Sequence, residues 1–233
     1  MRIVVNQLTR MDAHRICIAG IQPTTGRHIR PTTGRSNPLT RTLLAEEGGP
    51  LALGALIDLG EVKANPDPPE TEDHLFWPGR MAVLGRVSSD RYLEILRAHA
   101  QPSLRAIFGP TLARHNRTYA VDREQGSISL GILGSRRKSS VLLDKYGKLR
   151  LRLPTKERAA YLPLTDLRLV EADHTTIKAN AVEDLNARMG RGIESLLLLG
   201  LSRAYRKDGE EHERHWLQVN GICMSDKPID QLP

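Results

Sequence analysis

The sequence predicts a mainly β protein of two β-rich halves, each the size of a small barrel, joined by a short helical connection. Short segments rich in Ile, Val and Leu alternate with polar or Gly-containing turns, which is the pattern of short strands. The clearest helical spacing of apolar residues lies in 88–108, and strand patterns return after it. We therefore expect a first half over residues 1–87, a helical connection over 88–125 and a second half over 126–233.

In the first half, apolar segments bounded by turn residues predict strands at 2–8, 15–21, 28–31, 54–62 and 80–87. Residues 39–49 have the pattern of a short helix that is closed by Gly48 and Gly49. Residues 63–76 contain three prolines and a run of acidic residues, so we expect a surface loop there.

The helical connection begins at "SSDRYLEILRAHA", where Ser88 or Ser89 is placed to cap the helix. A second helical piece is expected at 103–109, and a basic segment follows it at 114–123. In the second half, the same reasoning as before predicts strands at 126–133, 139–154, 163–172, 194–202 and 215–224.

Composition and cysteine usage favour a folded cytoplasmic protein. Of the 233 residues, 39% are hydrophobic and 26% are charged, which is ordinary for a globular chain. The longest apolar run, Ile193 to Leu201, falls short of the roughly 18 residues that span a bilayer, so we expect no membrane segment. The N-terminus lacks the pattern of a secretory signal. Cys17 and Cys223 are the only cysteines and form no C-x-x-C pair, so a reducing compartment is the simplest expectation.

Basic residues are numerous and unevenly distributed. Arginine accounts for 26 of the 34 basic residues, and its guanidinium binds phosphate in a bidentate manner. A GC-rich genome is an alternative cause of this ratio. Residues 1–41 carry a net charge of +6 and residues 80–152 a net charge of +10, while 42–79 and 153–233 carry −7 and −2. Basic blocks that share one face would form a phosphate-binding surface, and blocks that point apart would be solvated.

The pentapeptide Pro-Thr-Thr-Gly-Arg occurs twice within thirteen residues, at 23–27 and 31–35. Its hydroxyls, exposed backbone N–H groups and arginines suit phosphate oxygens. The alternative is a polar turn that is repeated by chance or by a local duplication. The predicted nucleic-acid contacts of this region are Arg15, Arg27, His28, Arg30, Thr32, Thr33 and Arg35.

A second basic patch is expected on the hairpin at 135–152. Leucines at 149, 151 and 153 alternate with Arg150 and Arg152, so the arginines should share the solvent face of a strand. A solvated hairpin without function is the alternative. The predicted contacts here are Arg136, Arg137, Lys138, Lys148, Arg150 and Arg152.

Several segments together resemble the dual OB-containing domain family. "RICIAGI", "GRHIRP", "LGALIDLGEV" and "ETEDHLF" are similar, in that order, to its early strands, and "LLLLGLSRAY" and "HWLQVNGI" are similar to its late ones. The chain departs from the family pattern at His28, Thr32 and Asp73, where an aromatic residue, Val and Asn are usual. The resemblance implies two small five-stranded OB-like barrels and a role in recognising nucleic acid alongside prokaryotic modification or defence systems.

The sequence contains no complete catalytic motif, and we expect neither a metal nor a cofactor. His212 and His215 form a H-x-x-H pair without a third ligand, and the segment 70–74 could hold Mg²⁺ only if its carboxylates converge. Aromatic residues make up 4% of the chain, which favours contacts with phosphate and sugar over the stacking of many bases. Trp77 and Tyr146 could stack on bases, whereas Trp216 is expected in the core.

The expected partner is DNA or RNA, bound by an accessory module. Two alternatives remain open, a subunit that docks partner proteins in a larger nucleoprotein assembly and a metal-dependent enzyme that modifies nucleic acid.

Overall fold

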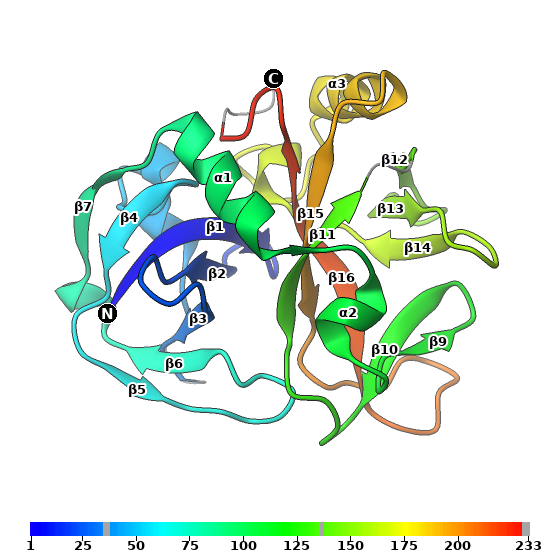
Figure 1. The fold of residues 1–233 in the computed structure, drawn as a ribbon, viewed down its shortest axis with the longest axis horizontal. Coiled ribbons are helices and arrows are strands. Elements are labelled where there is room, and N and C mark those ends of the chain that lie inside the picture. Colours follow the sequence, from blue (N-terminus) through cyan, green and yellow to red (C-terminus); the bar gives the residue numbers. More distant parts are fainter. Residues whose placement is uncertain (35–37, 136–137, 230–233) are drawn as a thin grey trace.

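The protein is mainly β, and its strands form two curled half-barrels with three short helices beside them (Figure 1). The computed structural model describes residues 1–34, 38–135 and 138–229. None of the helices in these ranges is long and apolar enough to cross a membrane. This architecture is consistent with two OB-like barrels, which confirms the predicted fold class.

The first half consists of one seven-stranded sheet with the order β5-β6-β3-β2-β1-β4-β7. Neighbouring strands are antiparallel except for β3 and β6, and bulges in the β1–β2 and β4–β7 pairs help the sheet to curl. The strands that the sequence predicted in this half are present. Their bounds are β1 Arg2–Arg10, β2 Ile16–Ile21, β3 His28–Thr32, β4 Ala55–Asp58, β5 Val62–Ala64, β6 Asp73–Phe76 and β7 Ala82–Arg86.

The first copy of the repeated pentapeptide forms the turn between β2 and β3. Gly26 adopts a φ of +71°, and its N–H donates to the carbonyl of Gln22 at 2.8 Å. A side chain at this position would meet Nε2 of His99 at 2.2 Å, so both the backbone conformation and the close approach require glycine. The second copy begins with the last two residues of β3, and no described atom lies within 4 Å of a Cβ built on Gly34.

The second half contains a six-stranded sheet and a three-stranded sheet. The six-stranded sheet has the order β8-β11-β15-β16-β10-β9, and the three-stranded sheet has the order β12-β13-β14. Thr165 joins the two by donating its N–H to the carbonyl of Val219 at 2.9 Å. The bounds are β8 Ala100–Gln101, β9 Ala113–His115, β10 Thr118–Asp122, β11 Leu130–Ser135, β12 Ser140–Leu143, β13 Leu149–Leu153, β14 Ala160–Pro163, β15 Ser195–Leu201 and β16 Arg214–Met224.

The helix α1 (Ser89–His99) lies between the two halves (Figure 1). Ser88 caps it, since its hydroxyl accepts a hydrogen bond from the N–H of Arg91 at 3.2 Å. Its buried Tyr92 and Leu96 pack in one cluster with Val4 of the first half and Leu198 of the second. The halves therefore share part of their hydrophobic core. The other helices are α2 (Leu104–Phe108) and α3 (Ala179–Gly190), which pack on the second half.

Four of the segments with an expected structure differ from the sequence prediction, and no element was expected where α3 lies. Residues 39–49 form two 3₁₀ turns, Arg41–Leu43 and Ala45–Glu47, in place of an α-helix. Residues 113–122 form the hairpin β9–β10 of the six-stranded sheet, so the connection after α2 is not helical. Of the strand expected at 163–172, only the first residue belongs to a strand, as the last residue of β14, and the 3₁₀ turn Leu167–Leu169 follows.

The fourth difference is the segment 63–76, where a surface loop was expected. Its ends form β5 and β6, and Glu70, Glu72, Asp73 and His74 are buried. The expectation was wrong because these charged side chains pair with residues from distant parts of the chain. The polarity of the segment itself gives no information about such partners.

Candidate nucleic-acid interface

The N-terminal arginines that the structure describes do not form one cluster. Arg15 precedes β2, is exposed and pairs with Asp12. Arg27 is exposed in the turn at the opposite end of the same strand. Seven extended residues separate the two ends by roughly 20 Å, so Arg15 and Arg27 lie too far apart to grip one phosphate.

Arg30 is buried, with 6% of its surface exposed, which departs from the prediction that it is an open phosphate contact. Its Nε donates to Oδ1 of Asp73 at 2.6 Å, and its Nη2 donates to the hydroxyl of Ser129 at 2.8 Å. Burial by itself would lower the pKa of Arg30, but the adjacent carboxylates more than offset this and raise it. Arg30 therefore holds the two halves together.

The same buried network contains the acidic segment before β6. Glu72 accepts hydrogen bonds from the N–H groups of Ser129 and Leu130, at 2.9 and 3.1 Å. Arg203, in the loop after β15, pairs with Asp73 and lies 3.6 Å from Oε1 of Glu70. These contacts neutralise the segment and join the first half to the second.

Glu70 lies within ion-pair distance of His215, since its Oε1 is 3.0 Å from Nδ1 of the imidazole. Burial pushes the pKa of Glu70 upward, but His215 and Arg203 outweigh it and the net shift is downward. His212 is exposed and separate, so the H-x-x-H pair does not converge. Over the described ranges, no group of three or more His, Cys, Asp or Glu side chains is placed to hold a metal ion.

His28 begins β3 and is half-buried beside His99 of α1. Burial, with a smaller contribution from His99, lowers the pKa of His28 to about 4. It is therefore neutral at physiological pH and does not add positive charge to Arg27. Thr32 ends β3 and Thr33 follows it, and both are half-buried.

The basic hairpin has the two faces that the sequence predicted. Leu149, Leu151 and Leu153 are buried, while Arg152 is exposed and Arg150 is half-buried on the opposite face of β13. Gly147, with a φ of +71°, closes the turn between β12 and β13. Exposed Lys138 and Lys148 lie at the ends of these strands.

Most of these cations have no anionic partner. In the part of the chain that the structure describes, Lys138, Lys148 and Arg152 form no ion pair, and Arg150 pairs with Asp144 at 2.9 Å. Arg35, Arg136 and Arg137 lie outside the described residues.

Aromatic rings flank this basic sheet, which the low aromatic content did not predict. Tyr161 of β14 is the register partner of Arg152, and the guanidinium of Arg117 lies 5.6 Å from its ring centroid. All four described cation–π pairs lie in the second half. Strand pairing places Tyr161 beside Arg152, whereas Lys145 and Tyr146 are neighbours in the sequence. The signals available in the sequence were therefore the period-two pattern of β13 and the turn that contains Tyr146.

Lys207 lies at the rim of this surface, in the loop between β15 and β16. Its ammonium is 3.4 Å from the ring centroid of Trp216, which is buried as predicted. Burial, followed by repulsion from Arg150, lowers the pKa of Lys207 to about 8, with Glu210 acting in the opposite direction. The exposed ring of Tyr205 packs beside Trp216.

The fold and this surface define a class of protein in which paired β-barrels present basic, ring-flanked strands to solvent. The chain belongs to the dual OB-containing domain family, whose family model matches residues 1–222. Comparison with curated proteins and with solved structures finds no match. The OB fold is often associated with nucleic-acid binding.

Proposed function

We propose that this protein is an accessory module that binds nucleic acid through its phosphate backbone, using the outward face of the sheet β12–β13–β14. The observation that carries the proposal is the pair Arg150 and Arg152 on one face of β13, above buried leucines. Their surroundings are rigid because the opposite face is packed into the core of the second half. A preorganised guanidinium loses little entropy when it binds phosphate.

Lys138, Lys148 and Arg152 support the proposal by their lack of anionic partners among the described residues. Phosphate can therefore bind them without first breaking an ion pair, and it releases counterions when it does so. We propose that Arg27 adds a phosphate contact from the first half.

The rings beside the sheet favour contact with sugars and bases as well as with phosphates. Tyr161 of the edge strand β14 offers a half-buried ring beside Arg152, with the guanidinium of Arg117 5.6 Å from its centroid. A base or sugar that lies on this ring keeps its phosphates within reach of both arginines. The further placement of the protein in a prokaryotic defence or nucleic-acid modification system rests on the family resemblance alone.

The test is fluorescence anisotropy of labelled single-stranded and duplex DNA and RNA between roughly 50 and 200 mM salt. The double variant Lys148→Glu with Arg152→Glu should bind at least about tenfold more weakly, with a salt slope that is smaller by about two. The matched control is Arg91→Glu, an exposed position on α1. A folded double variant that binds like the control would remove this surface from the proposal.

A subunit of a larger assembly is the second candidate function, and β7 is the observation that favours it. This strand ends the seven-stranded sheet, and all of its residues are exposed, including Val83 and Leu84. An open edge with apolar side chains suits an added strand from a partner protein. Complexes purified from the native host should retain a partner with the wild-type chain and lose it with Val83→Lys, whereas unchanged retention would contradict docking at β7.

A further inference from the structure

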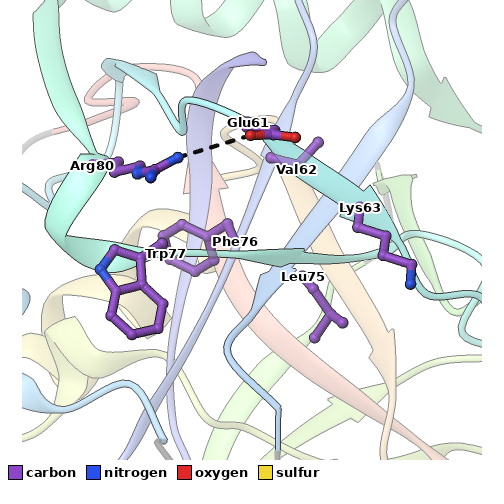
Figure 2. A pocket seen from close by; sticks show the side chains of 7 residues that line it. All are labelled: Glu61, Val62, Lys63, Leu75, Phe76, Trp77 and Arg80. Carbon is purple, nitrogen blue, oxygen red and sulfur yellow. Dashed lines mark ion pairs between the residues drawn. The ribbon is translucent and has the colours of Figure 1, made fainter.

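A shallow hollow lies on the first half, away from the basic sheet, between β5, β6 and the 3₁₀ turn Pro78–Arg80 (Figure 2). Its volume is about 510 Å³. Apolar side chains of the two strands form its floor, and charged side chains and one indole stand around it (Figure 2). The lining residues are Glu61, Val62, Lys63, Leu75, Phe76, Trp77 and Arg80.

Trp77 is the main feature of the hollow. Its side chain is 67% exposed, although an indole ring contributes a large apolar area that is normally covered. Gly79 lies beside the ring, since a Cβ built there would be 3.3 Å from the indole Nε1. The turn thus lies against the Nε1 edge of the ring, and most of the side chain is open to a flat ligand.

Two cations line the hollow, with Arg80 beside Trp77 at one end and Lys63 at the other end (Figure 2). Lys63 is the register partner of Leu75, which places it diagonally from Trp77 at about 7–8 Å between Cβ atoms. Arg80 contacts Glu61 at 3.8 Å, and both side chains are highly exposed, so this pair is weak and opens at little cost.

From these features we infer that the hollow binds one unpaired nucleotide of a strand, with its base on Trp77, one phosphate near Arg80 and the next phosphate toward Lys63. A ring for the base and cations for the phosphates meet the two main chemical needs of that ligand. A base within a duplex is stacked and paired, and it cannot reach the ring. The inference rests on the proposed function, because the hollow and the basic sheet would both bind nucleic acid. It adds that the nucleic acid is single-stranded where it meets Trp77.

Tryptophan fluorescence can test the inference, because the two tryptophans of the chain differ in exposure. Trp77 is 67% exposed and Trp216 is 2% exposed, so iodide should quench mainly Trp77. Tryptophan emission of the intact protein is measured with a ten-nucleotide deoxyadenylate strand, with AMP and with the same strand in duplex form. Anisotropy of the labelled strand is recorded in parallel.

We expect the single strand to quench Trp77 and to shield it from iodide, and the duplex to do neither. Trp77→Phe should remove this response, and Trp77→Ala should weaken strand binding about tenfold, as expected for the loss of one stacking ring. Lys63→Gln should weaken it about threefold. Lys227→Gln, an exposed lysine near the C-terminus, should leave it unchanged.

The outcomes separate this inference from the proposed function. A strand that binds by anisotropy while Trp77 stays open to iodide overturns the hollow as a site and leaves the function standing. Quenching by AMP without strand binding supports a site for free nucleotides and contradicts the proposed function. Neither quenching nor a change in anisotropy overturns both.

Discussion

Arg30 and Asp73 form an ion pair that is almost completely shielded from water, with 6% and 2% of their surfaces exposed. Their residue types are those of a solvated surface, yet Ser129 and Arg203 complete a network that satisfies both charges. A buried charge is tolerated only with such partners. At the scale of one residue, burial therefore decides whether an arginine is a structural group or a ligand contact.

Replacing Asp73 with Asn should lower the free energy of unfolding by about 3 kcal/mol, because Arg30 then keeps its charge in a buried site without its closest counter-ion. Urea denaturation followed by far-UV circular dichroism measures the loss. Asp12→Asn is the matched control, since it breaks an exposed pair with Arg15 and should cost less than about 1 kcal/mol. Equal losses in both variants would show that the buried network contributes little.

Binding should weaken between pH 7 and pH 9 as Lys207 loses its proton. Burial and Arg150 place its pKa at about 8, so the ammonium is about nine tenths charged at pH 7 and about one tenth at pH 9. The loss of one phosphate contact corresponds to about threefold in affinity. Lys207→Arg should remove the decline, because arginine stays charged at pH 9, and anisotropy titrations at both pH values measure it. A decline of the same size in Lys207→Arg would assign it to another group.

At the scale of elements, the two copies of the pentapeptide serve different places in the fold. The first closes the β2–β3 hairpin against α1, whereas the second begins within β3, of which Pro31 and Thr32 are the last residues. Both glycines adopt positive φ, at +71° and +79°. Gly26 is packed against His99, and Gly34 has open space around it.

Gly26→Ala should therefore destabilise the protein more than Gly34→Ala. Both substitutions place a Cβ in a left-handed conformation, at a cost of about 1–2 kcal/mol. Only at Gly26 does the new Cβ also overlap with the ring of His99, which adds about 1 kcal/mol or more. Thermal and urea unfolding of the two variants measure the difference, and equal destabilisation would contradict the packed turn.

The positions of most strands could be predicted from local sequence, whereas the position of α3 could not. Its buried Ala181, Leu185 and Met189 recur every four residues, a narrow stripe within a polar helix that lacks a side-chain cap at Lys178. The four-residue spacing is visible in the sequence, but so narrow an apolar stripe is a weak signal for a helix unless the sheet that it packs against is known. β9 and β10 were missed for a related reason, because Arg117 and Arg123 flank β10 and its pairing with β16 supplies the stability.

At the scale of the whole molecule, the two halves are joined by a shared core as well as by the buried network. Val4 and Ile21 of the first half pack in one cluster with α1 and with Ile132, Leu196 and Leu198 of the second. Asn220 of β16 also donates to the side-chain carbonyl of Gln7 in β1 at 2.7 Å. The division into a first barrel over 1–87, a connection over 88–125 and a second barrel over 126–233 stays a prediction.

The shared core leads us to expect one cooperative unfolding transition for the intact chain. In Trp77→Phe, fluorescence reports only Trp216 in the second half, while far-UV circular dichroism reports both halves. The two signals should give the same urea midpoint, because neither half can keep its side of the core alone. Separate midpoints would show that the halves are independent domains.

The sequence by itself determined the mainly β class, the positions of most strands, the turns at Gly26 and Gly147 and the two faces of β13. All of these depend on neighbours within a few residues, where periodicity and backbone preference act. Tertiary structure alone decided which charges are buried and which are free. Arg30 binds Asp73 and Ser129, 43 and 99 positions away, while Arg152 remains open beside Tyr161. The physical reason is that desolvation and ion pairing depend on distance in space, which strand pairing and packing create.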